Sequence, residues 1–386
     1  MSKLRKHIEL FAGCGGMALG MQTAGFILSF ANEVSPMASR TFAYNLLGEK
    51  ISIPNKKVKW LHSGYSNKDH EKRLRENLLS HKVDENCEIE NDPRLISLEK
   101  TLLVGDVRCL RNRFAEIGVS DPYNGELDLI SGGPPCQSFS LAGKRELNDY
   151  KNRLPLVFAD ICEMLNPKVI LLENVKGILS AFSENGVKYY AWFEVAKAFA
   201  MKGFAPVCML INSKYFGVAQ NRPRYFMMAF RSDIFKKLLS RHPDNDIISN
   251  VQDFVTKIQN KKNIRVCDLK YHDIEKNKIF FDGKILPKPI SFEKESWYSV
   301  SDAIDDLVSS SRHKQSSYVK SINKMFQTKS DKFNITQNHN IRNHSNKTKD
   351  RFLFYQILNL LNGNQDLILK EKRKGRIISS NLINEI

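Results

Sequence analysis

Short apolar runs alternate with helical stretches through the first 231 residues, and this alternation limits the possible folds more than any other feature. The runs end at Gly, Pro, Asn or Asp and cover residues 8–12, 27–32, 102–105, 127–131, 169–173, 205–211 and 225–230. A helical pattern spans residues 154–165. Buried strands separated by helices predict a doubly wound, mostly parallel α/β sheet. The last two runs are joined by a loop too short for a crossover helix, so we expect that pair to be antiparallel.

The composition is that of a globular protein. Of the 386 residues, 42% are hydrophobic and 26% are charged, which is enough apolar surface for a sizeable core. No apolar segment approaches the length of a membrane span, and residues 1–10 lack the apolar run of a signal peptide. We therefore expect a cytoplasmic location and no membrane partner. The seven cysteines are scattered and form no CxxC pair, so neither a disulfide framework nor a metal site is expected.

Positive charge gathers near the end of the chain. The formal net charge is +17; residues 311–386 hold 15 Lys and Arg against 5 Asp and Glu, whereas residues 1–231 hold 31 against 24. This balance favours a polyanionic partner, with nucleic acid as the leading candidate. The basic end is also rich in Asn, Ser and His. It is therefore either a surface that faces nucleic acid or a solvated, loosely packed end.

A glycine-rich loop, Gly13-Cys14-Gly15-Gly16, follows the first apolar run and opens the first helical stretch. Glycines allow a ligand to approach main-chain N–H groups closely, but the spacing fits neither the GxxxxGKS/T nor the complete GxGxxG motif. Glu33 ends the second run and can accept hydrogen bonds from ribose, and Asp106 follows the third and can accept one from adenine. This combination favours an adenosyl ligand without phosphates, S-adenosylmethionine. Alternatively, each acidic residue caps the following helix.

A second loop, Gly132-Gly133-Pro134-Pro135-Cys136, follows the fourth apolar run. Two glycines and two prolines set a rigid backbone at the carboxyl end of a strand, where ligands gather in open α/β sheets. Cys162 and Cys208 lie inside apolar segments and suit the role of small buried hydrophobes. Cys136 differs because loop side chains are generally exposed and the prolines fix the direction of its sulfur.

Four segments, taken in order, resemble the cytosine-5 DNA methyltransferase family of bacterial restriction–modification systems. They are similar to the family's motifs I, IV, VI and VIII and span residues 11–16, 133–140, 173–175 and 220–224. The resemblance implies a Rossmann-like methyltransferase fold with a doubly wound mixed sheet. It also implies S-adenosylmethionine as methyl donor and double-stranded DNA as substrate.

The resemblance assigns roles to the residues of these motifs. In the family, a cysteine thiolate adds to carbon 6 of cytosine, which makes carbon 5 nucleophilic enough to take a methyl group. Cys136 matches this nucleophile, and Glu173 matches the glutamate that contacts ring nitrogen 3 and the exocyclic amine. Asn174 should orient the loop, and Arg224 should contact the base carbonyl oxygen. Arg222 should support the cysteine loop or the DNA phosphate, although such arginines often make only surface ion pairs.

A cofactor pocket is also implied by the resemblance. The matching residues are Phe11, Gly13, Gly15, Glu33, Asp106 and Val107. Phe11 should pack on the cofactor, Glu33 should bind its ribose, and Asp106 with Val107 should hold its adenine. Val34 stands where several relatives carry a tryptophan that stacks on adenine, so we expect less aromatic contact.

Motifs IX and X of the family find no match in the sequence. In the family, motif X completes the cofactor pocket. The expected explanations are a split enzyme whose second polypeptide supplies both motifs, an interrupted gene, and a cropped chain. The expected organisation is a catalytic domain at residues 1–231 with a polar insertion at about 49–98. A partial target-recognition or partner-binding region should follow at residues 232–386.

Three functions are compatible with these motifs. The leading one is a DNA cytosine-5 methyltransferase that works beside a cognate restriction endonuclease. The second is an RNA cytosine-5 methyltransferase that acts on tRNA. The third is a truncated, inactive DNA-binding remnant, against which the intact Cys136, Glu173 and Arg224 speak. A target cytosine in duplex DNA has to be swung out of the stack before either of its ring carbons can react.

Overall fold

The computed structural model describes residues 4–49, 57–61, 98–118, 123–135, 153–184, 187–305, 315–326, 344–346 and 348–353. The chain divides into two compact units, residues 1–329 and residues 330–386. In the described part of the second unit, the His344 ring packs edge-on against Phe352 with centroids 5.4 Å apart. The sheet and the candidate site lie in the first unit. No helix among the described residues is long and apolar enough to cross a membrane.

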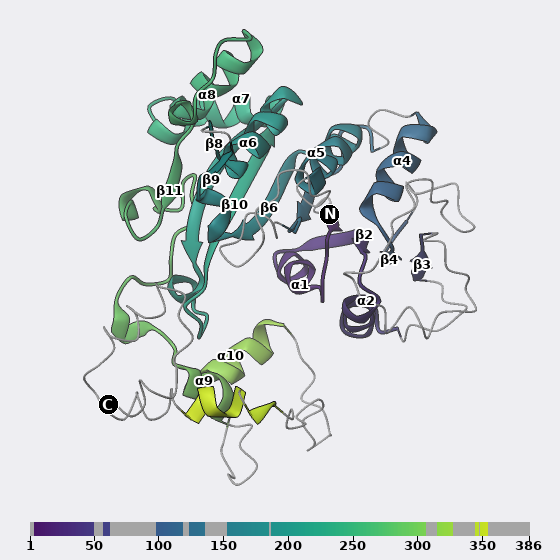
Figure 1. Ribbon diagram of the computed structural model, residues 1–386, viewed down its shortest axis with the longest axis vertical. Helices are drawn as coiled ribbons and strands as arrows, with labels where there is room; N and C mark the ends of the chain where they lie inside the picture. The colour runs from purple at the N-terminus through teal and green to yellow at the C-terminus, as the bar shows by residue number, and fades with distance from the viewer. Residues whose placement is uncertain are drawn as a thin grey trace. The chain divides into compact units, whose positions relative to one another are not determined.

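A nine-stranded mixed sheet forms the centre of the described first unit, in the order β11-β9-β10-β6-β5-β1-β2-β4-β3 (Figure 1). The strands are β1 (Arg5–Leu10), β2 (Phe26–Glu33), β3 (Val58–Trp60), β4 (Thr101–Val104), β5 (Leu129–Gly132), β6 (Val169–Val175), β9 (Phe204–Asn212), β10 (Pro223–Arg231) and β11 (Tyr271–Asp273). Neighbouring strands are parallel, except that β10 runs antiparallel to both β6 and β9. A separate hairpin pairs β7 (Phe182–Glu184) with β8 (Val187–Tyr189).

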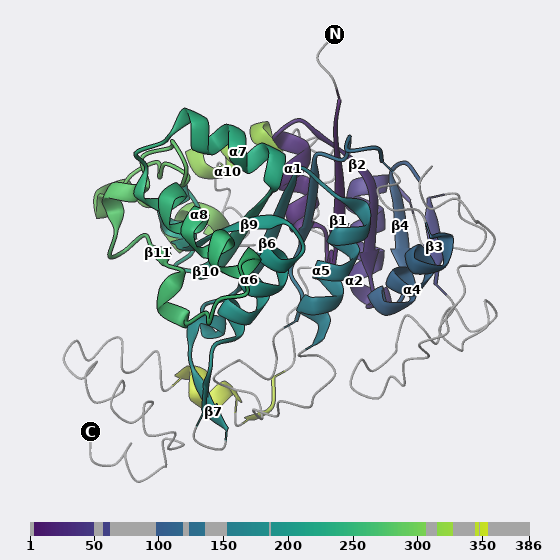
Figure 2. The ribbon, with the colours of Figure 1, turned by 90° about the horizontal axis from the view of Figure 1, so that it is seen from above.

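Helices cover both faces of the sheet. The helices are α1 (Gly16–Thr23), α2 (Pro36–Phe42), α4 (Val107–Ile117), α5 (Leu154–Leu165), α6 (Ala191–Met201), α7 (Ser232–Arg241), α8 (Asp246–Gln259), α9 (Val300–Ile304) and α10 (Ser317–Met325). Short helical turns include η1 (Ala43–Leu47), η6 (Lys176–Leu179) and η7 (Ser213–Phe216). Helices α4, α5, α6 and α8 lie in a row on one face, and α1 and α2 lie on the other (Figure 2). This arrangement confirms the predicted doubly wound α/β fold.

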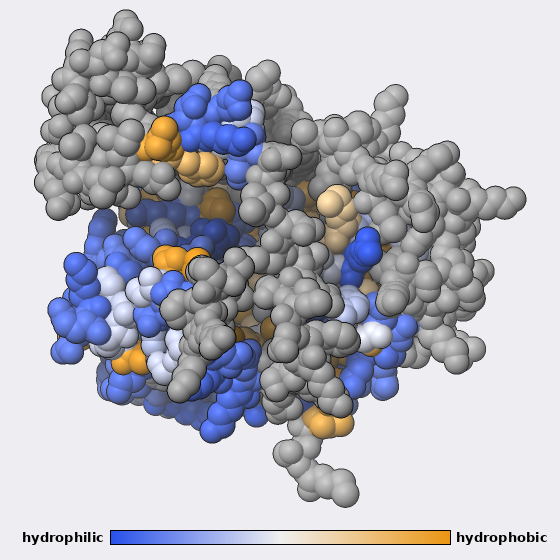
Figure 3. Space-filling view, turned by 90° about the horizontal axis from the view of Figure 1, so that it is seen from below, coloured by the Kyte–Doolittle hydropathy of each residue, from blue (hydrophilic) through white to orange (hydrophobic). Residues whose placement is uncertain are grey.

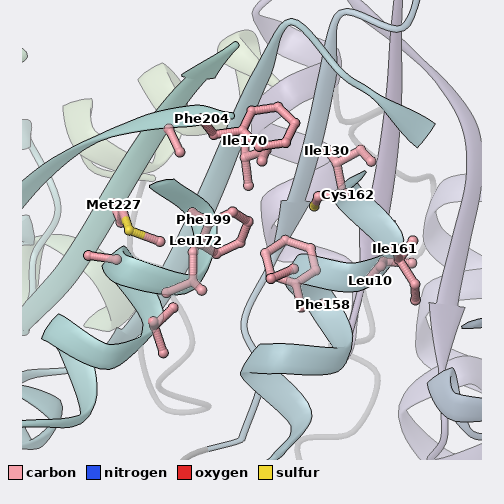
Figure 4. Packing of buried hydrophobic residues seen from close by; sticks show 14 of the residues in the cluster. Leu10, Ile130, Phe158, Ile161, Cys162, Ile170, Leu172, Phe199, Phe204 and Met227 are labelled. Atoms are coloured by element: carbon pink, nitrogen blue, oxygen red, sulfur yellow. The ribbon is translucent and has the colours of Figure 1, made fainter. Parts of the chain in front are cut away.

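The largest core lies between the central strands and helices α5 and α6 (Figure 4). Ile130 of β5 and Leu172 of β6 are fully buried there with Phe158 of α5 and Phe199 of α6. The two phenylalanine rings meet edge to face with centroids 5.9 Å apart. Burial of each such side chain stabilises the fold by about 1.5–3 kcal/mol. Cys162 lies in the same cluster, where burial raises the pKa of its thiol well above the ordinary value, as expected of a structural cysteine.

Each of the seven apolar runs overlaps a strand, and the predicted helix is α5 with the same bounds. The β9–β10 pair is antiparallel, as predicted from its short loop. The sequence did not reveal the edge strands β3 and β11, because three residues are too few to show a periodicity. Most of the expected insertion at about 49–98 lies outside the described residues, but β3 falls within it. Residues 232–305 belong to the same compact unit as the sheet, and the division at residue 231 stays a prediction.

Candidate active site

Parallel strands bring the predicted site residues to one edge of the sheet. The carboxyl ends of β1, β2, β4, β5 and β6 all lie at this edge. The glycine loop follows β1, Glu33 ends β2, Asp106 follows β4, and the Gly-Gly-Pro-Pro segment begins at the end of β5. Glu173 lies near the end of β6, and Arg224 lies near the start of β10, which runs the other way. The edge therefore gathers residues from six separate segments. On the face of the molecule seen in Figure 3, hydrophilic side chains predominate among the described residues, with scattered hydrophobic ones between them.

The backbone of the glycine loop has positive φ angles, which residues other than glycine rarely adopt. Gly13 and Gly15 have φ angles of +56° and +89°, and Phe11 also has a positive φ of 57°. A Cβ on Gly15 would lie 2.3 Å from Leu46 Cδ1 and 2.8 Å from Phe42 Cδ2, so packing as well as conformation requires glycine. A Cβ on Gly13 would meet nothing within 4 Å. The open side of the loop is therefore at Gly13.

Glu33 ties the glycine loop to β2. Its Oε2 accepts a hydrogen bond of 2.7 Å from the Gly13 amide, and its Oε1 accepts one of 2.7 Å from the Ser35 amide. Burial raises the pKa of this carboxyl, and the amides of Ser35 and Gly13 partly offset the rise. Ser35, not Glu33, caps α2 by accepting from the Ala38 amide. The expected contact of Glu33 with ribose stays a prediction.

Asp106 caps α4, which is the alternative that the sequence left open. Its Oδ1 accepts a hydrogen bond of 2.8 Å from the Arg108 amide and lies 3.0 Å from Arg108 Nε. Val107 is buried in the core beside it. Sequence reasoning missed Gly105, whose φ is +152° and whose added Cβ would lie 2.5 Å from Leu61 Cβ. A contact of Asp106 or Val107 with adenine stays a prediction.

The cysteine loop is described only up to Pro135, so Cys136 lies outside the described residues. Asn174 holds the described part of this loop: it is buried, and its Nδ2 donates a hydrogen bond of 3.0 Å to the Pro134 carbonyl. Its Oδ1 accepts a hydrogen bond of 2.9 Å from the Val175 amide. Both ends of the amide are therefore satisfied, which fixes the distance between β6 and the Pro-Pro segment.

Glu173 and Arg224 form an ion pair at the edge of the sheet where the parallel strands end, which we call the reactive edge. Arg224 Nε lies 2.8 Å from Glu173 Oε1, and the two side chains are only 19% and 27% exposed. A Cβ on Gly133 would lie 3.1 Å from Glu173 Oε2, so this carboxylate lies directly against the Gly133 backbone. Burial raises the pKa of Glu173, against the opposing charges of Arg224 and Arg222. The exposed Arg222 is anchored through its amide, which donates 3.0 Å to Asn212 Oδ1.

Sequence reasoning also missed Glu9, which lies in β1 just before the loop. The residue is 2% exposed, and its Oε2 has no hydrogen-bond partner among the described residues. Burial raises the pKa of Glu9 to about 8; the Ala18 amide opposes this rise, and the charge of Glu33 adds to it. In the sequence, the sign that could have revealed Glu9 was a single acidic residue within an apolar strand.

Comparison with known proteins gives the family. The profile of the C-5 cytosine-specific DNA methylases matches residues 5–67 and 102–380 and so extends well past the four motifs. Type II methyltransferase M.DdeI of Desulfomicrobium norvegicum is 29% identical over 58% of this chain and 40% of its own length. M.AquIA of Picosynechococcus is 29% identical over 59% of this chain and 72% of its own length.

The chain spans 40% of the length of M.DdeI and 48% to 49% of the length of two further curated type II methyltransferases, M.NgoPII of Neisseria gonorrhoeae and M.FnuDI of Fusobacterium nucleatum. A crystal structure of Spodoptera frugiperda DNMT2 covers 59% of this chain and 50% of that one at 20% identity, with a TM-score of 0.32. The family profile covers most of the chain, whereas this overlay carries no weight. The chain belongs to the C-5 cytosine-specific DNA methylase family.

Proposed function

We propose that this chain transfers a methyl group from S-adenosylmethionine to carbon 5 of cytosine in double-stranded DNA, as the methyltransferase of a restriction–modification system. The observation that carries the proposal is the Glu173–Arg224 ion pair, which lies against Gly133 beside the loop that Asn174 holds. Asn174 holds this loop by donating a hydrogen bond to the Pro134 carbonyl, and Cys136 comes two residues after Pro134 in the sequence. The described part of the loop that leads to Cys136 therefore lies beside a carboxyl and a guanidinium that match the polar edge of cytosine.

The residues at the glycine loop fit S-adenosylmethionine, the methyl donor that this family uses. The space at Gly13 is open, so a ligand can approach the loop backbone there. The Glu33 carboxylate beside it has lone pairs beyond those used by Gly13 and Ser35, and these can accept ribose hydroxyls. Phe11 offers an aromatic ring that is only partly buried. When bound, the cofactor supplies an electrophilic methyl group.

The proposed reaction assigns a proton or a bond to each of three side chains. The Cys136 thiolate bonds to carbon 6 of the target cytosine, and electron density moves toward ring nitrogen 3 and carbon 5. Glu173 hydrogen-bonds to nitrogen 3, and burial, which raises the pKa of this carboxyl, makes it easier for Glu173 to carry the proton that it donates there. Arg224 donates to the carbonyl oxygen. When carbon 5 has taken the methyl group, its proton passes to a water molecule, the double bond between carbons 5 and 6 reforms, and the Cys136 thiolate is expelled.

A second polypeptide that supplies motifs IX and X stays part of the proposal, as does a cognate endonuclease encoded in the same system. M.AquIA supports the first of these, because the matched region makes up 72% of its length but only 40% of the length of M.DdeI. The relatives named type II methyltransferases support the second. Methyl transfer to tRNA is the outcome that would favour the RNA alternative.

The test is to express the chain alone and together with the product of the adjacent reading frame. Transfer of labelled methyl groups to duplex DNA and to tRNA is then measured. We expect label in DNA, and we expect Cys136→Ser to abolish it. Duplex DNA with 5-fluorocytosine at the target, which cannot lose its carbon-5 substituent, should form a denaturation-resistant adduct with the parent only. Transfer retained in the variant would remove Cys136 as nucleophile, and transfer to tRNA alone would overturn the DNA proposal.

A further inference from the structure

Asn212, the last residue of β9, is a buried amide that joins both ends of the β9–β10 connection. Its Oδ1 accepts a hydrogen bond of 3.0 Å from the Arg222 amide and one of 3.4 Å from the Lys214 amide. Its Nδ2 donates a hydrogen bond of 2.7 Å to Asn221 Oδ1. The neighbouring Ser213 Oγ donates 2.7 Å to the Gln220 carbonyl. The turn that carries Gln220, Asn221 and Arg222 is thus closed on the end of β9.

A carboxylate from the region after residue 231 completes this network. Asn212 Nδ2 donates a second hydrogen bond, 3.1 Å long, to Glu275 Oε1, and the same oxygen lies 3.1 Å from Lys214 Nζ. Lys214 in turn stacks over Trp297, with its ammonium 4.5 Å from the ring centroid. Glu275 therefore sets the direction of the Asn212 amide, because a carboxylate can only accept hydrogen bonds and so holds the NH₂ group toward itself.

The network acts on the reactive edge through the main chain. Asn212 is paired with Pro223 in the β9–β10 ladder, so the anchored turn leads straight into Arg224 and its ion pair with Glu173. The charge of Arg222 also reaches this pair, because it lowers the pKa of Glu173. Arg224 is held by its own ion pair, whereas the described hydrogen bonds that place Arg222 are made by its backbone.

We infer that Asn212 and Glu275 are positioning residues for methyl transfer, which hold the turn before β10 so that Arg222 and Arg224 stay beside Glu173. The inference rests on the proposed function. It adds two residues from outside the four motifs to the machinery that orients the target base. It also explains why an asparagine is buried at the end of an otherwise apolar strand. The amide donates twice through Nδ2 and accepts through Oδ1, whereas a hydroxyl has a single donor and an aliphatic side chain has none.

The test reverses the polarity of one hydrogen bond. Asn212→Asp keeps the acceptor for the Arg222 amide but places a carboxylate against Glu275, and should lower kcat about tenfold through misplacement of the turn. Glu275→Gln in addition supplies an NH₂ donor to the introduced carboxylate, and the exposed Asn221 amide can turn to donate as well. We expect the double variant N212D/E275Q to recover kcat to within about threefold of the parent. KM for S-adenosylmethionine should stay unchanged throughout.

Asn250→Asp is the matched control. Asn250 likewise joins two segments, donating 3.2 Å to the Asp268 carbonyl and accepting 3.0 Å from the Lys270 amide, but it does so away from the reactive edge. This variant should lower the melting temperature without changing kcat. If Asn212 had only a structural role, Asn212→Asp would behave like this control. Its melting temperature would fall, its kcat would equal that of the parent, and Glu275→Gln would rescue nothing.

Each outcome decides the inference. Parental kcat in folded Asn212→Asp, or a double variant no better than the poorer single one, overturns it. Should Asn212→Asp fail to fold, the exposed residues carry the test: lower kcat in Asn221→Ala or Glu275→Gln supports the inference, and parental kcat in both overturns it. A parent that transfers no methyl group to DNA, alone or with the adjacent product, is a separate result. It refutes the proposed function and the inference with it.

Discussion

Replacing Glu9 by glutamine should stabilise the protein, and more so as the pH rises. Glu9 is 2% exposed, and burial raises its pKa from 4.5 to about 8. The folded state therefore binds the proton more tightly than the unfolded state. The contribution of this group to stability is fully present below pH 4.5 and is lost as the pH rises to about 8. Each pKa unit corresponds to about 1.4 kcal/mol, so the loss approaches about 3 kcal/mol at pH 7 and about 5 kcal/mol above pH 8.

Glutamine has nearly the same shape and never ionises, so Glu9→Gln removes this loss. The free energy of unfolding, from urea titrations at pH 5, 7 and 8.5, should be similar for parent and variant at pH 5. It should favour the variant by a few kcal/mol at pH 8.5. Glu116→Gln is the control, because that side chain is 62% exposed in a surface pair with Arg113. A difference between Glu9→Gln and the parent that does not change with pH would refute the reasoning.

Other substitutions probe the edge and the core separately. Gly15→Ala should lower the free energy of unfolding by about 2 kcal/mol or more, because its Cβ meets Leu46 and its φ is +89°; an unchanged melting temperature would contradict this. Burial lowers the pKa of His7 from 6.5 to about 4, so stability should fall as the pH drops through that range, and His7→Gln should flatten the slope in acid titrations. Asn174→Ala leaves the buried Pro134 carbonyl without the hydrogen bond from Asn174. It should lower the free energy of unfolding, measured by thermal melts, by about 1–3 kcal/mol and should also lower kcat.

The strands were predictable because they read as continuous apolar runs, whose residues are buried or half-buried on both faces of the sheet. The position of the site was predictable for the same reason, since parallel strands put their carboxyl ends at one edge. The role of Asp106 was not predictable, because an aspartate that caps a helix and one that binds adenine stand at the same position after a strand. The structure shows the cap.

Other features depend on contacts between distant segments. Position 15 requires glycine partly because Leu46 lies against it. Leu46 belongs to η1, beyond α1 and α2, and no local sequence pattern reveals that contact. Asn212 ends a strand next to a serine, which by itself signals only a turn; its partners Arg222 and Glu275 come from two later segments. The edge strands β3 and β11 have three residues each and are specified by the strands they join.

The reversed strand β10 is what allows the site to form. Arg224 pairs with Val175 and Phe226 pairs with Glu173, so Arg224 and Glu173 are diagonal neighbours on one face of the β6–β10 ladder. Diagonal neighbours are about 7–8 Å apart, a span that arginine and glutamate close together. A parallel nine-residue strand would begin about 30 Å away, at the opposite edge of the sheet. A register slip of one residue would instead send Arg224 to the other face and leave the Glu173 carboxylate without its cation. The short connection before β10 and the hydrogen bonds that close it are therefore part of the chemistry, because they fix both the direction and the register of the strand that carries the arginines.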